Sequence, residues 1–162
     1  MAFSDEPNAA PEYGSLKTLT VLTFIGSALG FIGGIYQFIN AEKGVENMEK
    51  AMANPDTPEF AKKMMTPEAL EAARIGAANK LPILILGLIG VVLCTVGAMQ
   101  MRKLKQQGYY LWLIGEVIPI IGSLLFLGSA AFAGGFMTYI IYGIILLFII
   151  LYTMQRKYLI NK

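Results

Sequence analysis

The sequence predicts an all-α integral membrane protein, a bundle of four transmembrane helices with short amphipathic helices between the first and the second. Hydrophobic residues make up 56% of the 162 residues and charged residues only 15%, a composition outside the usual range of soluble domains. The apolar residues are gathered into blocks of about 20, the length that spans a bilayer as a helix. The longest uncharged run, Val117 to Gln155, is long enough for most of a two-helix hairpin.

The charged and turn-forming residues divide these blocks, and they set the boundaries of nine expected segments. We expect a polar tail at 1–17, a first span at 18–40, an extramembrane helical segment at 41–80, a second span at 81–101, a basic loop at 102–108, a third span at 109–130, a short turn at 131–135, a fourth span at 136–154 and a basic tail at 155–162.

The first span carries glycine at every fourth position, at Gly26, Gly30 and Gly34. Two overlapping GxxxG steps on one helix face let a neighbouring backbone approach closely. Packing within this chain's own bundle is one interpretation of that face. A seam with another copy or with a partner subunit is the other.

The extramembrane segment contains two patterns that begin helices. Thr57-Pro58-Glu59 and Thr66-Pro67-Glu68 each place a hydroxyl residue before a proline and an acid, as at the first turn of a helix. Asn54-Pro55-Asp56 predicts a turn between two such helices. We therefore expect two or three short helices here.

This segment is also rich in methionine, a flexible side chain that adapts to irregular surfaces. A helical cap on the bundle or on the lipid headgroups is one use of such residues, and docking of another protein is the alternative. The candidate docking surface consists of Met48, Met52, Met64 and Met65.

The second and third spans carry small residues on one face each. Gly87, Gly90, Cys94 and Gly97 form a stripe on the second span, and in the third Gly108, Gly115 and Gly122 recur every seven residues. Heptad spacing of small residues predicts a close, left-handed helix packing seam. We expect Gly115 and Gly122 to pack against a neighbouring helix.

Short basic clusters predict the orientation. Arg102, Lys103 and Lys105 flank the second and third spans, Arg156 and Lys157 follow the fourth, and basic residues next to spans favour the cytoplasmic side. Both termini are therefore expected in the cytoplasm and 41–80 outside. The basic entry to the third span, from Lys103 to Tyr110, is typical of small bacterial membrane proteins, so we expect the bacterial cytoplasmic (inner) membrane.

Glu116 is the one ionisable acid or base within the four expected spans, apart from tyrosine and cysteine side chains. It lies roughly 10 Å along the third span if that span begins at Tyr109. An ionisable group at this depth is a candidate functional residue. Counting depth along the other spans places Thr23–Ser27, Cys94–Thr95 and Ile145–Leu147 at its level, and Pro119 frees a backbone carbonyl beside it. The candidate intramembrane proton, ion or partner site is Glu116, Pro119, Thr95 and Ser27.

Two roles for Glu116 remain open at this point. It serves a small proton- or cation-coupled carrier or channel, or it has a structural role. In the structural role it either fixes helix register as a protonated or water-bridged carboxyl group or meets a base on a partner. The spans carry few other polar residues, which favours the second role.

The composition also excludes much chemistry. Histidine is absent and Cys94 is the single cysteine, so one chain cannot form a Cys/His zinc site, a CxxC centre or a disulfide. We expect no cofactor, no metal site and no catalytic residues, hence no enzyme, and a net charge of +2 predicts no nucleic-acid partner. We expect a non-enzymatic accessory or structural subunit, surrounded by lipid, that packs against itself or a larger membrane complex. A small carrier or channel is the alternative.

Overall fold

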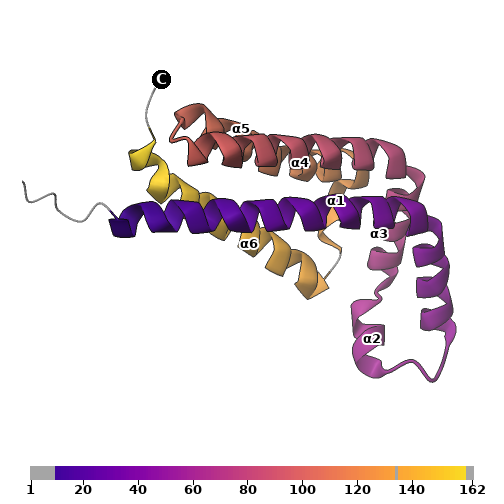
Figure 1. Ribbon diagram of the computed structural model, residues 1–162. Helices are drawn as coiled ribbons and strands as arrows, with labels where there is room; N and C mark the ends of the chain where they lie inside the picture. Colours follow the sequence, from indigo (N-terminus) through magenta and orange to yellow (C-terminus); the bar gives the residue numbers. More distant parts are fainter. Residues whose placement is uncertain (1–9, 134, 160–162) are drawn as a thin grey trace, which may run out of the picture.

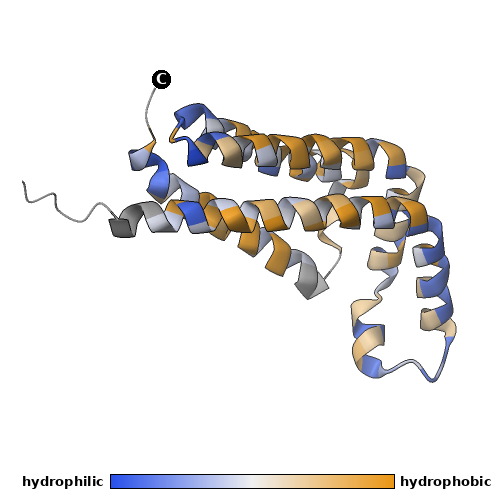
Figure 2. Cartoon of the chain, viewed as in Figure 1, coloured by the Kyte–Doolittle hydropathy of each residue, from blue (hydrophilic) through white to orange (hydrophobic). Residues whose placement is uncertain are grey.

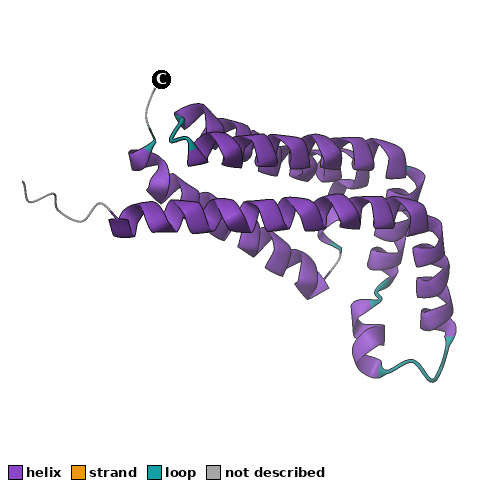
Figure 3. Cartoon of the chain, in the orientation of Figure 1, coloured by secondary structure: helices purple, strands orange, loops and turns teal. Residues whose placement is uncertain are grey.

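The computed structural model describes residues 10–133 and 135–159, and this part of the chain is helical with no strand (Figure 3). Within the described residues, short loops separate the helices (Figure 3). The elements are α1 (Ala10–Ala53), α2 (Glu59–Met64), α3 (Pro67–Ala78), α4 (Lys80–Arg102), α5 (Gln106–Leu127), the 3-10 helix η1 (Gly128–Phe132), α6 (Gly135–Gln155) and the 3-10 helix η2 (Arg156–Tyr158).

Four of these helices are long and apolar enough to cross a membrane: α1, α4, α5 with η1, and α6. Figure 2 shows their hydrophobic residues as nearly continuous bands, whereas the last turns of α1 and the region of α2 carry many hydrophilic residues. This distribution is that of membrane-spanning helices joined to an extramembrane segment.

The helices α4 and α5 form a hairpin, and α1 packs along α4 (Figure 1). Helix α6 crosses the others at a slant (Figure 1). The start of α1, the α4–α5 turn and the end of α6 lie together at one end of the molecule, which we call the basic end because Arg102, Lys103, Lys105, Arg156 and Lys157 are located there. The opposite end contains the start of α4 and is called the cavity end.

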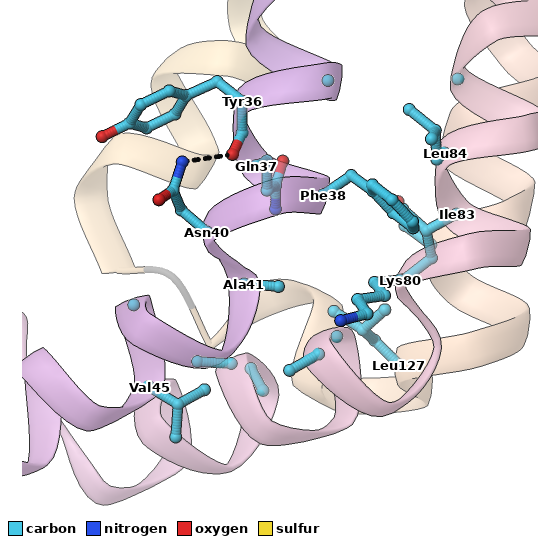
Figure 4. A pocket seen from close by; sticks show the side chains of 18 of the residues that line it. Tyr36, Gln37, Phe38, Asn40, Ala41, Val45, Lys80, Ile83, Leu84 and Leu127 are labelled. Carbon is cyan, nitrogen blue, oxygen red and sulfur yellow. Dashed lines mark hydrogen bonds between the residues drawn. The ribbon is translucent and has the colours of Figure 1, made fainter.

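Helix α1 is longer than one membrane crossing requires. Its 44 residues correspond to about 66 Å of helix, against a hydrocarbon thickness of about 30 Å. The ribbon bends near Ala41, and the remaining turns run beside α3 (Figures 1 and 4). Asn40 Nδ2 donates to the carbonyl of Tyr36 at this bend, a local side-chain bond that competes with the regular helix pattern.

The polar tail expected over 1–17 is helical from Ala10 onward. Leu16 and Leu19 are buried in a hydrophobic cluster with Met101, Tyr109 and Tyr152, so this part of α1 packs against the other helices. Acids and prolines in the sequence suggested a tail, but the two buried leucines are sufficient to dock this part of the helix.

Of the two predicted helix starts in the extramembrane segment, one is formed as predicted. Thr66 caps α3 by accepting from the backbone N–H of Ala69, and Pro67 is the first helical residue. The Glu68 carboxyl has a lowered pKa because its own backbone N–H and the Thr66 hydroxyl donate to it.

The other start is wrong in detail. Helix α2 begins at Glu59 after Pro58, and the Thr57 hydroxyl donates to the carbonyl of Ala51 instead of capping the helix. The turn at 54–56 is formed, since Asn54 Oδ1 accepts from the backbone N–H of Asp56. Thr57 therefore joins this turn to the end of α1.

The far end of α5 is set by Gly128. Its φ of +56° ends the α-helix, and η1 continues the chain to Phe132. The third span expected over 109–130 is thus an α-helix from Gln106 to Leu127 followed by a 3-10 turn. The predicted turn at 131–135 includes residue 134, which lies outside the described residues.

Candidate functional site

The closest approach between helices joins α4 and α5 through their glycines. A Cβ atom at Gly97 would lie 2.6 Å from the backbone nitrogen of Trp112, and one at Gly115 would lie 2.8 Å from that of Cys94. Gly122 lies against the side chain of Leu86. Any side chain at these glycines would push the helices apart. The heptad seam of α5 therefore packs against the predicted stripe of α4, except at Gly87, where an added Cβ would meet nothing within 4 Å.

Glu116 projects from α5 beside this interface and is half-buried. The Cys94 thiol donates to Glu116 Oε1 at 3.7 Å and also lies 3.6 Å from the carbonyl oxygen of Trp112. The polar contact of the carboxyl group is therefore a thiol on α4, from a residue that the sequence placed at the level of Glu116 but indicated as a small packing residue.

The structure does not bring the other predicted site residues to Glu116 through hydrogen bonds. Thr95 donates to the carbonyl of Val91 on its own helix. Ser27 on α1 is half-buried. Pro119 packs on Gly90, where a Cβ would lie 2.7 Å from Pro119 Cγ, and its own carbonyl accepts from Ser123. Pro119 thus contributes to helix packing.

A second polar pair in the apolar region joins α1 to α6. Thr23 Oγ1 and Tyr152 Oη are 2.8 Å apart and share a buried hydrogen bond. The Tyr152 ring lies 4.3 Å from that of Trp112, centroid to centroid, and both side chains are fully buried. Trp112 Nε1 has no hydrogen-bond partner among the described residues.

The sequence pattern did not indicate this pair. The available signal was weak, because threonine and tyrosine are common in membrane helices. Only the packing angle of α6 reveals that Tyr152 turns inward.

The glycines in the span of α1 differ in whether they contact another helix. Gly30 and Gly34 face α4 at ordinary contact distances, 3.5 Å from Val91 and 3.7 Å from Leu84 for an added Cβ. Gly26 and Gly33 have nothing within 4 Å. One face of α1 therefore packs within the chain while the face with Gly26 and Gly33 is open.

The four methionines proposed as a docking surface also separate into two kinds. Met48, Met52 and Met65 are half-buried within the extramembrane segment, whereas Met64 is exposed. Phe60, on α2 with Met64, is 76% exposed. The exposed apolar surface of this segment thus centres on Phe60, which the methionine pattern did not indicate.

A cavity of about 670 Å³ lies at the cavity end, between α1, α3, α4 and α5. Figure 4 shows Phe38 of α1 beside Ile83 and Leu84 of α4, with Lys80 next to them. The Lys80 ammonium lies 2.7 Å from Glu42 Oε1 and 5.6 Å from the centre of the Phe38 ring. This cavity was not predicted, because it depends on how α1 bends away from α4.

Among the described residues there is no group of three or more histidine, cysteine, aspartate or glutamate side chains placed to hold a metal ion. The pair of Glu116 and Cys94 can hold a proton, or Glu116 can accept a hydrogen bond from a donor on a partner protein. No known protein family, curated protein or solved structure matches the chain.

Proposed function

We propose that the chain is a four-span membrane protein that acts as a non-enzymatic subunit, packing against copies of itself or against a larger membrane protein. The observation that carries the proposal is the open glycine face of α1. Gly26 and Gly33 are one heptad apart and have nothing within 4 Å, while the glycines of the α4–α5 interface are in tight backbone contact.

The same chain therefore uses glycine for close helix packing and leaves a similar face free. In lipid, helices associate through close backbone approach at small residues, since lipid tails are as apolar as leucine. Leu29 lies between Gly26 and Gly33 on this face and is 65% exposed. A second transmembrane helix fits against Gly26 and Gly33, flanked by Leu29.

We place both termini in the cytoplasm. The basic end combines Arg102, Lys103 and Lys105 with Arg156 and Lys157 on one side of the apolar helices. In a Cys94→Ser background, a cysteine at Phe60 is expected to react with an impermeant maleimide in intact cells. A cysteine at Leu104 is expected to react only after permeabilisation, and the reverse pattern would invert the orientation.

Native mass measurement tests the subunit proposal. The tagged chain is extracted gently from its native membrane and weighed with whatever accompanies it. We expect a complex of defined stoichiometry that Gly33→Leu disrupts, while Gly14→Leu, at an equally open glycine near the start of α1, leaves it intact. A monomer from the unmodified chain, or equal behaviour of both variants, would refute the proposal.

A small proton- or cation-coupled carrier is the second candidate, and the position of Glu116 favours it. The carboxyl group lies within an apolar helix, half-buried and in contact with Cys94. For a carrier, Glu116→Gln abolishes proton-coupled flux in reconstituted vesicles. If the chain is a subunit instead, the vesicles show no proton-coupled flux before or after the substitution. The substitution then either leaves the complex intact or weakens its assembly.

A further inference from the structure

We propose that the cavity between α1, α3, α4 and α5 binds one anionic phospholipid, with an acyl chain in its apolar part and the phosphate beside Lys43 and Lys80. The volume of about 670 Å³ is within the range of about 300–1,000 Å³ typical of small-molecule sites. The inference is independent of the subunit proposal and requires only that the long helices cross a membrane.

The inner part of the cavity is largely apolar, and the hydroxyl of Ser123, which also lines it, donates to the carbonyl of Pro119. Leu84, Leu88 and Pro119 line it together with Gly87 and Gly122. Leu88 is eight residues beyond Lys80, so the cavity extends about 12 Å along α4 from the start of the helix. Apolar cavities of this kind exclude water and take up apolar groups.

The outer part of the cavity is polar and positively charged. Lys43 and Lys80 are the only charged residues among its lining residues, and Tyr36, Gln37, Asn40 and Asn47 add neutral polar groups. Glu42, which does not line the cavity, neutralises Lys80 in part through their 2.7 Å contact. Lys43 therefore supplies the additional positive charge next to the opening.

The polarity of the cavity follows the polarity of a bilayer. Lys43 follows the apolar stretch of α1 and Lys80 precedes that of α4, so both lie where the headgroups of a bilayer would be, and the leucines of the cavity lie deeper in the span. A phospholipid has the same arrangement, with a charged phosphate above apolar chains. Basic pockets between transmembrane helices on the matrix or cytoplasmic side hold anionic headgroups. The same charge complementarity on the other side of the membrane makes an anionic lipid a better occupant of this cavity than an apolar helix of a partner.

One lining glycine can be replaced by a large side chain that fills the cavity without disturbing the helix packing. Gly87 lines the cavity and a Cβ there would meet nothing within 4 Å. Leucine at this position would project into the space that the acyl chain occupies. Gly143 on α6 is equally open and is not a lining residue, so Gly143→Leu is the matched control.

The test measures lipid binding to the purified, delipidated full-length chain by native mass spectrometry. The two probes are phosphatidylglycerol and phosphatidylcholine with identical acyl chains. We expect one phosphatidylglycerol per chain to be retained in preference to phosphatidylcholine, and Gly87→Leu to lose it while Gly143→Leu retains it.

The lysine variants test the headgroup contact separately and remain informative if Gly87→Leu fails to fold. Lys43→Gln and Lys80→Gln should each reduce the preference for phosphatidylglycerol about fivefold, the ratio that matches about 1 kcal/mol per lysine at an anionic headgroup. Lys50→Gln is the control, because Lys50 pairs with Glu46 away from the cavity. Equal affinity of the unmodified chain for both lipids, unchanged binding in folded Gly87→Leu, or a second polypeptide occupying the site in place of lipid would overturn the proposal.

Discussion

At the basic end, buried side chains from α1, α4, α5 and α6 touch one another, whereas at the cavity end α1, α3, α4 and α5 surround an open space. The cluster at the basic end contains Leu16, Met101, Trp112 and Tyr152, three of them fully buried. The opposite end contains a cavity of about 670 Å³ instead. The same four helices therefore form a tight core at one end only.

The difference follows from which residue types meet. At the basic end Trp112 and Tyr152 fill the space between helices, and the Thr23 hydrogen bond fixes α6 against α1. At the cavity end α1 presents Gly30 and Gly34, which are too small to fill the space left by its bend. Rigid packing and an open site are thus separated along the helices, an arrangement that lets one end bind a ligand without disturbing the core.

Among the variants that test this difference between the two ends, Gly97→Leu is expected to reduce the stability of the chain most. Its side chain would collide with the backbone of Trp112 and Gly108, so α4 and α5 could not pack, and we expect a loss of at least about 3 kcal/mol of stability. Circular dichroism during titration with sodium dodecyl sulfate measures this loss. Gly143→Leu, at an open position, should unfold like the unmodified chain, and similar unfolding of both variants would contradict the tight interface.

Trp112→Ala should destabilise the basic end nearly as much. Removing a fully buried indole leaves a cavity and deletes its contacts with Tyr152, at a cost of about 3–5 kcal/mol in protein cores. The same titration is suitable, since circular dichroism does not require the single tryptophan. Leu125→Ala, at a side chain that is 74% exposed, is the control and should change stability by less than about 0.5 kcal/mol.

Tyr152→Phe should have a smaller effect, about 1 kcal/mol, because it removes the hydrogen bond to Thr23 and keeps the ring contact with Trp112. A double-mutant cycle with Thr23→Val isolates the pair, and we expect the two losses to be non-additive. Full additivity would show that the two hydroxyl groups do not interact in the folded chain.

Gly87→Leu should have the smallest effect on stability. It lies on the same helix as Gly97→Leu, so the two variants contrast an open and a closed position of α4. Its side chain enters an existing cavity, so we expect a change of no more than about 1 kcal/mol, in the stabilising direction if the leucine packs well. The measurement is the same titration in lipid-free detergent. A loss as large as that of Gly97→Leu would mean that the cavity is closed.

Composition and charge clusters were sufficient to predict the helical class and the four long apolar helices. They were sufficient because a helix that crosses lipid must be continuous and apolar over about 20 residues, a constraint that acts on each segment alone. The start of α3 at Thr66 could be predicted for a similar reason, since a cap is a local feature.

Most contacts between helices could not be predicted, although the sequence did indicate that Gly115 and Gly122 pack against a neighbouring helix. Depth along each span placed Cys94, Thr95 and Ser27 at the level of Glu116, but depth does not determine which face of a helix turns inward, and of these residues Cys94 contacts the carboxyl group. The inward turn of Tyr152 and the cavity beside Lys80 both depend on the angles at which α6 and the bent α1 cross the hairpin. Such angles are set by all the side chains in an interface together.

The most direct test of the proposed subunit role is photo-crosslinking in the native membrane from one position on the open face of α1. A photoreactive residue replaces Leu29, which is 65% exposed between Gly26 and Gly33, and in a second chain it replaces Val92, which is 60% exposed on α4. We predict a discrete protein adduct from position 29 and mainly lipid adducts from position 92. Lipid adducts alone from position 29, or the same protein adduct from both positions, would contradict a helix packing seam on this face.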